Sequence, residues 1–120
     1  MKNFLSGIII TLCLFCTAAY WPNERATVPV GSDVGDSNVT LTVGSSSRVQ
    51  LFSTTLTGNK TITLSTTGAK NGDAFTVIRT GLGLFTLDLG GLKTLPSATA
   101  VSATVVFDGS AWRLMNYSLL

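Results

Sequence analysis

The sequence predicts an all-β protein, folded as a small antiparallel sandwich or barrel-like knob behind a hydrophobic N-terminal segment. Short apolar runs alternate with small polar residues through the stretch from Asn59 to Tyr117, which is the period of a half-buried strand. Gly, Asn and Asp cluster at the breaks between the runs, as they do in the tight turns that join strands. No stretch after Tyr20 shows a helical period of any length.

The chain of 120 residues has room for one domain, and its composition divides it into three parts. Residues 1–20 form a hydrophobic leader, residues 21–37 a linker or arm, and residues 38–120 the β domain. A domain of this size buries only a modest core, so association with other chains would stabilise it considerably.

The leader has a basic start at Lys2, an apolar centre that ends at Phe15, and small residues up to Ala19. That layout is typical of a secretory signal peptide with cleavage after Ala19. A lipoprotein signal is a second interpretation, but bulky residues precede both Cys13 and Cys16. A third interpretation keeps the segment as an apolar helix, buried among sister chains because it has no polar face. The candidate anchor residues are Phe4, Ile8, Ile9, Leu12 and Phe15.

The linker contains Pro22 and Pro29, which favour extended chain, and a polar stretch that contains Gly31. Its Asp33 and Asp36 invite a calcium interpretation, since hard cations take clustered carboxylates. They lack the regular acidic spacing and the terminal Glu of a calcium loop, so we interpret them as turn-capping residues.

Seven strands are expected in the β domain, with two strong hairpin signals between them. Asn71-Gly72 and Asp108-Gly109 tolerate the positive φ that hairpin turns require. The expected strands are Asn38–Val43, Arg48–Phe52, Lys60–Ser65, Ala74–Thr80, Leu84–Leu89, Thr99–Phe107 and Ala111–Tyr117.

Alternation along these strands assigns their faces. Phe75 and Val77 should point one way, and Thr76 and Ile78 the other. The expected core continues through Phe85, Leu87, Leu89, Val105, Phe107, Trp112 and Leu114. Several strands are apolar on both faces while only 12% of the residues are charged, so one face is either covered or in contact with another subunit. The sequence therefore predicts a homo-oligomer, and a trimer in particular.

The residues of the β domain offer little chemistry. The chain has no His, and its two cysteines lie in the leader, so the usual bases, thiol nucleophiles and soft metal ligands are absent. The acids after the linker are Asp73, Asp88 and Asp108, and only Asp88 falls within a strand. We expect no enzyme, no catalytic residue, no metal and no cofactor. Nucleic acid is also not expected, because the net charge of +2 comes from scattered basic residues.

Two aromatic residues near the C-terminus have the chemistry to stack on a sugar. Trp112 and Tyr117 supply the rings, with Arg113 or Asn116 as hydrogen-bonding neighbours. The alternative is that Trp112 fills the core or a subunit interface, where Trp and Tyr are equally favoured. The candidate oligomer or glycan contacts are Phe85, Phe107, Trp112, Arg113 and Tyr117.

Several short phrases of the chain resemble a known class of β modules. They are Leu56–Ser65, Asn71-Gly72-Asp73, Leu87–Leu95 and the ending Phe107-Asp108-Gly109-Ser110-Ala111-Trp112. Together they resemble the C-terminal β modules of bacteriophage virion proteins, found on tail spikes, tail fibres and head fibres or decorations. The resemblance covers Val39 to the C-terminus. It implies a structural module that is commonly trimeric, contacts other virion proteins and in some cases binds host surface glycans.

The expected function is therefore that of a non-catalytic virion structural protein, displayed on the capsid or tail. The leader departs from the resemblance, since virion proteins usually assemble in the cytoplasm and need no export signal. The alternative is a secreted or envelope-anchored bacterial surface protein that binds carbohydrate, and contact with a membrane stays open. Whether the mature chain begins at Met1 or near Tyr20 separates the two hypotheses.

Overall fold

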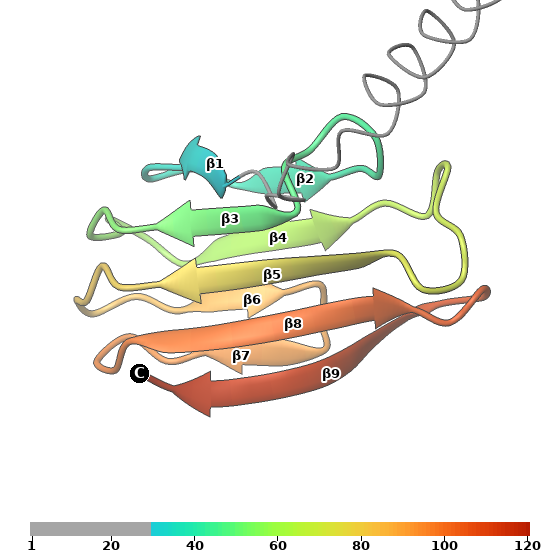
Figure 1. The fold of residues 1–120 in the computed structure, drawn as a ribbon. Coiled ribbons are helices and arrows are strands. Elements are labelled where there is room, and N and C mark those ends of the chain that lie inside the picture. Colours follow the sequence, from blue (N-terminus) through green and yellow to red (C-terminus); the bar gives the residue numbers. More distant parts are fainter. Residues whose placement is uncertain (1–29) are drawn as a thin grey trace, which may run out of the picture.

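The computed structural model describes residues 30–120, which form two β-sheets packed face to face (Figure 1). This described part contains strands and no helix, so the predicted all-β class is confirmed. The strands are β1 (Val30–Asp33), β2 (Val39–Leu41), β3 (Val49–Phe52), β4 (Lys60–Leu64), β5 (Ala74–Arg79), β6 (Leu87–Leu89), β7 (Lys93–Leu95), β8 (Val101–Phe107) and β9 (Trp112–Leu119).

The two sheets differ in width by one strand. Sheet A has five strands in the order β1-β3-β5-β8-β9, and sheet B has four in the order β2-β4-β6-β7. From β1 to β6 the chain alternates between the sheets, so each strand of one sheet is followed by a strand of the other.

This alternation makes the first six strands parallel within their sheets, in contrast to the predicted antiparallel arrangement. β3 lies between β1 and β5 and is parallel to both, and β4 lies between β2 and β6 in the same way. The register stacks Val39 on Ile62 and Ile62 on Leu89. The strand pairs β1–β2, β3–β4 and β5–β6 are therefore three coils of a two-sheet parallel β-solenoid, in which each coil contacts its neighbours.

The last three strands, which we name the cap, are antiparallel. β7 pairs with β6 in sheet B, β8 pairs with β5 in sheet A, and β9 pairs with β8. The hairpin predicted at Asp108-Gly109 is confirmed, because it joins β8 to β9 and Gly109 has a φ of 94°. Here the predicted antiparallel pairing is correct.

The second predicted hairpin, at Asn71-Gly72, is wrong. The turn is tight, since Gly72 has a φ of 94°, but it carries the chain from β4 in sheet B to β5 in sheet A. The Gly72 N–H donates to the carbonyl of Phe107 at 2.8 Å, so the turn binds the end of β8 instead of closing a hairpin. A turn signal therefore located the bend without revealing which strands it connects.

The corners where the chain passes from sheet A to sheet B are held by side chains of the preceding coil. Asn38 accepts the N–H of Thr61 at 2.8 Å, and Asn59 accepts the N–H of Thr86 at 2.9 Å. Asp36 accepts the N–H of Thr57 at 3.1 Å. Each hydrogen bond joins one coil to the next, because it gives a backbone N–H of the next coil an acceptor on a side chain of the preceding coil.

Two strands are absent from the prediction, and one of them shifts the domain boundary. β1 lies inside the segment assigned to the linker, yet it is parallel to β3 in sheet A. Asp33 at its end binds the N–H of Gly35 at 2.9 Å, as a turn-capping residue does, and also contacts the hydroxyl of Ser53 in the next coil. β7 is the other missed strand, and the expected strand Leu84–Leu89 is shortened to β6.

The core lies between the sheets and follows the predicted alternation. Phe75 and Val77 are buried, while Thr76 and Ile78 on the other face are half-buried. Two predictions for the core are corrected: Phe85 is only half-buried, and Leu114 is exposed. The buried apolar residues are Leu41, Phe52, Leu56, Ile62, Phe75, Val77, Leu87, Leu89, Leu95, Val101, Ala103, Val105, Phe107 and Trp112.

Candidate functional site

Trp112, the first residue of β9, belongs to the core and is 7% exposed. Its ring centroid lies 5.4 Å from that of Phe75 and 5.3 Å from that of Phe107, with the Phe107 ring edge-on. Its indole N–H donates to the carbonyl of Ser65 at 3.0 Å. Aromatic clusters of this geometry stabilise a core beyond the area that they bury, so the interpretation of Trp112 as a core residue is the one that this geometry favours.

The other predicted contact residues do not converge on one point. Phe107 packs on Trp112, but Arg113 is exposed and bound to Asp108 at 2.9 Å. Tyr117 is half-buried, with the Lys93 ammonium 4.5 Å from its ring centroid, a cation–π contact. Phe85 lies in the loop between β5 and β6. The predicted set therefore contains a core pair and three separate surface or partly buried residues.

The inner side of β9 has no strand of sheet B opposite it, because sheet A is one strand wider (Figure 1). Leu114, Tyr117 and Leu119 are the register partners of Val105, Ala103 and Val101, and residues directly opposite each other share a face of the sheet. They therefore point the same way as the core residues of β8. β7, the last strand of sheet B, covers this side only in part, through the contact of Lys93 with Tyr117.

We name the exposed or half-buried apolar residues of this edge the β9 surface: Leu114, Tyr117 and Leu119, which the register places on the inner side, together with the neighbouring Met115 and Leu120. Met115 is 69% exposed and Leu119 is 65% exposed. Met115 lies at a bulge, where the register shifts between Thr104 and Val105. β9 is also the last strand of sheet A, and the outer edge of such a strand is a template for pairing with another chain.

A cleft of about 440 Å³ opens on sheet B. It lies where β4 continues beyond the end of its neighbour β6. The last register pair of the two strands is Ile62 with Leu89. The Gly90 N–H then donates to the Ile62 carbonyl at 2.8 Å, and after it the chain leaves β4. Leu64 at the end of β4 is left facing the space. The lining residues are Thr61, Ile62, Thr63, Leu64, Thr66, Asp88, Gly90, Leu92, Ser110, Ala111 and Trp112.

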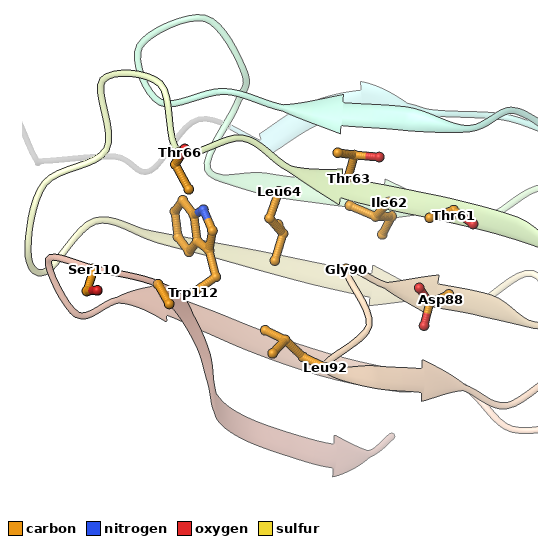
Figure 2. A pocket seen from close by; sticks show the side chains of 11 residues that line it. Thr61, Ile62, Thr63, Leu64, Thr66, Asp88, Gly90, Leu92, Ser110 and Trp112 are labelled. Carbon is orange, nitrogen blue, oxygen red and sulfur yellow. The ribbon is translucent and has the colours of Figure 1, made fainter.

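The cleft has an aromatic end and an acidic end. Figure 2 shows the indole of Trp112 at one end, the carboxylate of Asp88 at the other, and Leu64 and Leu92 between them. Asp88 is half-buried and accepts the N–H of Gly91 at 3.0 Å. Its carboxylate is the only charged group among the lining residues.

The remaining acids of the described residues have structural partners. Asp73 lies 3.4 Å from Arg48, and Asp36 lies 3.5 Å from Lys60. Hydrogen bonds from Thr57 lower the pKa of Asp36. Backbone N–H donation from Ala111, with the Arg113 side chain and the Ser110 N–H, lowers the pKa of Asp108 to about 2. Among residues 30–120, no group of three or more His, Cys, Asp or Glu side chains lies close enough to hold a metal ion.

One buried residue that was not predicted from the sequence is an arginine. Arg79 at the end of β5 is fully buried, and its guanidinium donates to the carbonyls of Gly81, Leu95, Pro96 and Phe85 at 2.6–3.2 Å. Burial lowers the pKa of this guanidinium. The alternation of β5 was the available signal, because it places Arg79 on the same face as Phe75 and Val77.

Comparisons with protein-family models, with curated proteins and with solved structures find no match for this chain. The candidate anchor residues Phe4, Ile8, Ile9, Leu12 and Phe15 lie outside the described residues. Within residues 30–120, no helix is long and apolar enough to cross a membrane.

Proposed function

We propose that this chain is a non-catalytic structural protein of a bacteriophage virion, displayed on the capsid or tail as a homotrimeric β knob. The observation that carries the proposal is the β9 surface, where apolar side chains extend past the last strand of sheet B. Apolar surfaces that are continuous and uncovered mark interaction sites on soluble proteins. The partner that we assign to this surface is another copy of the same chain.

The charges of the β9 surface suit contact between identical copies. Arg113 is the one charged residue in β9, and Asp108 neutralises it at 2.9 Å. Lys93 is held against Tyr117. Arg113 therefore adds no unpaired charge to a contact between copies, whereas Lys93 has to lie apart from its counterpart, because opposed like charges would cost several kcal/mol in an interface.

The same end of the molecule carries further exposed leucines. Leu82 and Leu84 lie in the loop between β5 and β6, and Figure 1 places this loop at the end where β9 reaches the C-terminus. This end of the knob therefore carries exposed apolar side chains in addition to the β9 surface. A trimer is the assembly proposed because the phage appendage modules that the sequence resembles are commonly trimeric.

The experiment measures the mass of the assembly for the full chain and two lysine variants. Leu119→Lys places a charge in the β9 surface, and Thr40→Lys places the same charge on β2, an exposed position at the opposite edge of the other sheet. Native mass spectrometry and sedimentation should give trimers for the wild type and Thr40→Lys and monomers for Leu119→Lys. A wild type that stays monomeric at micromolar concentration would refute the assembly.

A second function, carbohydrate binding by a secreted or envelope-anchored bacterial protein, is favoured by the cleft on sheet B. Its lining combines hydroxyl groups, a carboxylate and apolar side chains. The mature N-terminus discriminates between the two functions. Intact-mass measurement of the protein from its natural source should give a chain that begins at Met1 if it is a virion protein, and one that begins at Tyr20 if it is secreted.

A further inference from the structure

We infer that the cleft between β4, the β6–β7 turn and the β8–β9 hairpin is a binding site for a neutral saccharide. The inference rests on the second proposed function, carbohydrate binding at this cleft, and does not depend on the virion role, because the cleft is built by a single chain. Its volume of about 440 Å³ lies in the range of about 300–1,000 Å³ typical of small-molecule sites.

The lining has the two kinds of surface that a sugar requires. Thr61 and Thr63 supply hydroxyl groups on the outer face of β4, where Thr61 is the register partner of Asp88, and Thr66 and Ser110 supply two more; each hydroxyl both donates and accepts hydrogen bonds. Leu64, Leu92 and Trp112 supply apolar contact. A pyranose ring likewise presents hydroxyl groups at its rim and C–H groups on its faces, so both surfaces find partners.

Asp88 is placed to bind hydroxyl groups at one end of the cleft (Figure 2). Its Oδ2 already accepts the Gly91 N–H at 3.0 Å, which fixes the carboxylate relative to the turn. An ionised carboxylate has about four acceptor sites, so acceptor capacity remains for two adjacent sugar hydroxyls. Hydrogen bonds to a charged acceptor are stronger than those between neutral groups.

The opposite end of the cleft is rigid before any ligand arrives. Trp112 is held by its bond to Ser65 and by the rings of Phe75 and Phe107, so no rotamer freedom has to be lost on binding. Preorganisation of this kind improves affinity by lowering the cost of ordering the site. Because Trp112 is 7% exposed, it contributes a narrow apolar edge and not a full stacking face.

The charge of the cleft selects among possible ligands. Asp88 is the only charged lining residue and no Lys or Arg lines the space, so an anionic sugar would meet repulsion without a compensating cation. A small organic cation would be attracted by Asp88, but Trp112 is only 7% exposed and therefore offers little of the indole face that a cation–π contact needs. Neutral saccharides are therefore the class that fits.

The test is an NMR titration of the full chain. The neutral ligands are the methyl glycosides of glucose, galactose, mannose and N-acetylglucosamine, and the charged probes are glucuronate and tetramethylammonium. At least one neutral glycoside should shift the amide signals of Gly90, Leu92 and Ser110 and the indole signal of Trp112, with a millimolar dissociation constant. The two charged probes should leave these signals unchanged.

Three variants locate the site and control for folding. Asp88→Asn keeps the shape but removes the charge, and we expect binding to weaken by about tenfold or more. Thr63→Val removes one hydroxyl and should weaken binding severalfold. Thr40→Val is the matched control, since Thr40 is the register partner of Thr63 one coil earlier and lies outside the cleft; it should bind like the wild type.

The outcomes separate this inference from the proposed assembly. Leu119→Lys should retain saccharide binding even as a monomer. The inference would be overturned if the signal changes were confined to other regions of the chain, or if Asp88→Asn bound the glycosides as well as the wild type does. It would also be overturned if glucuronate or tetramethylammonium bound more tightly than every neutral glycoside. The absence of any shift at high millimolar glycoside would overturn it as well.

Discussion

The three parallel coils and the antiparallel cap are built from similar strands but held together differently. In the coils, adjacent strands of a sheet are distant in sequence, and Asn38 and Asn59 bind the backbone of the next coil at each corner. In the cap, β8 and β9 are adjacent in sequence and are joined by a four-residue loop that Asp108 stabilises. The coils therefore depend on contacts between repeats, whereas the cap depends on a local turn and an aromatic cluster.

The largest effect is expected in the cap, from Trp112→Ala. Removal of the indole leaves a cavity beside Phe75 and Phe107 and should reduce the free energy of unfolding by about 3–5 kcal/mol. Urea denaturation measures this change. Arg113→Ala is the control at the next position, where an exposed ion pair contributes about 0–1 kcal/mol. A loss well below ~1 kcal/mol for Trp112→Ala would place the ring at the surface.

The next effect concerns Arg79, which connects the two regions. Its guanidinium binds Gly81 and Phe85 in the last coil, and Leu95 and Pro96 at the end of β7. Arg79→Met removes every donor, which leaves the two buried carbonyls of Gly81 and Leu95 without this partner, and each buried polar group left unpaired costs about 1–3 kcal/mol. We expect a total loss of roughly 3 kcal/mol in urea denaturation. Hydrogen exchange should also rise around residues 81–86 and at Leu95 and Ser97, the amides on either side of Pro96. Protection there equal to that of the wild type would show that Arg79 does not join the regions.

A smaller effect is expected at the corners of the coils. Asn59→Ala removes the acceptor for the N–H and hydroxyl of Thr86 and should reduce the free energy of unfolding by about 1 kcal/mol. Asn38→Ala should cost a similar amount at the preceding corner. Asn71→Ala, an exposed turn position, is the control and should stay within about 0.5 kcal/mol. Equal effects of all three variants would refute a special role for the corners.

The smallest effect is the contribution of Asp108 to stability in acid. Because its pKa falls from 3.8 to about 2 on folding, its carboxylate stabilises the folded state above pH 3.8, and that stabilisation is lost as the pH falls through about 2. Urea denaturation between pH 6 and pH 2 should show this loss. Asp108→Asn should reduce the pH dependence of the free energy of unfolding. If the variant keeps the full pH dependence of the wild type, that dependence comes from other carboxylates such as Asp36, whose pKa is also lowered.

The sequence predicted the strands better than it predicted their pairing. Alternation of side chains is local, so it located β5 and β8 and their inward faces from Phe75 to Phe107. The parallel pairing depends on which sheet each strand joins. A Gly or Asn in a turn is compatible both with a hairpin within one sheet and with a turn from one sheet to the other, so it does not distinguish them. A repeat was the missed signal: Val39-Thr40-Leu41 is similar to Ile62-Thr63-Leu64 at the spacing of 23 residues that the register uses.

The candidate sites were predictable only in part. The sequence placed Trp112 and Tyr117 near the C-terminus and Asp88 within a strand, but not the convergence of Asp88 with Trp112 on one cleft. That convergence follows from the early end of β6 at Leu89, which no local pattern reveals. The exposure of Leu114 and Leu119 likewise follows from the unequal number of strands in the two sheets.

The parallel coils also make the length of this protein adjustable. β3 and β4 each pair in parallel with a strand of the previous coil and with a strand of the next coil. Duplication of residues 49–73 would therefore add one coil without changing the cap. Each added coil would move the cap by about 4.8 Å along the stack, the spacing of neighbouring strands. The distance between the β9 surface and the first strand is thus set by the number of coils, which a lineage can change by duplication while the cap is conserved.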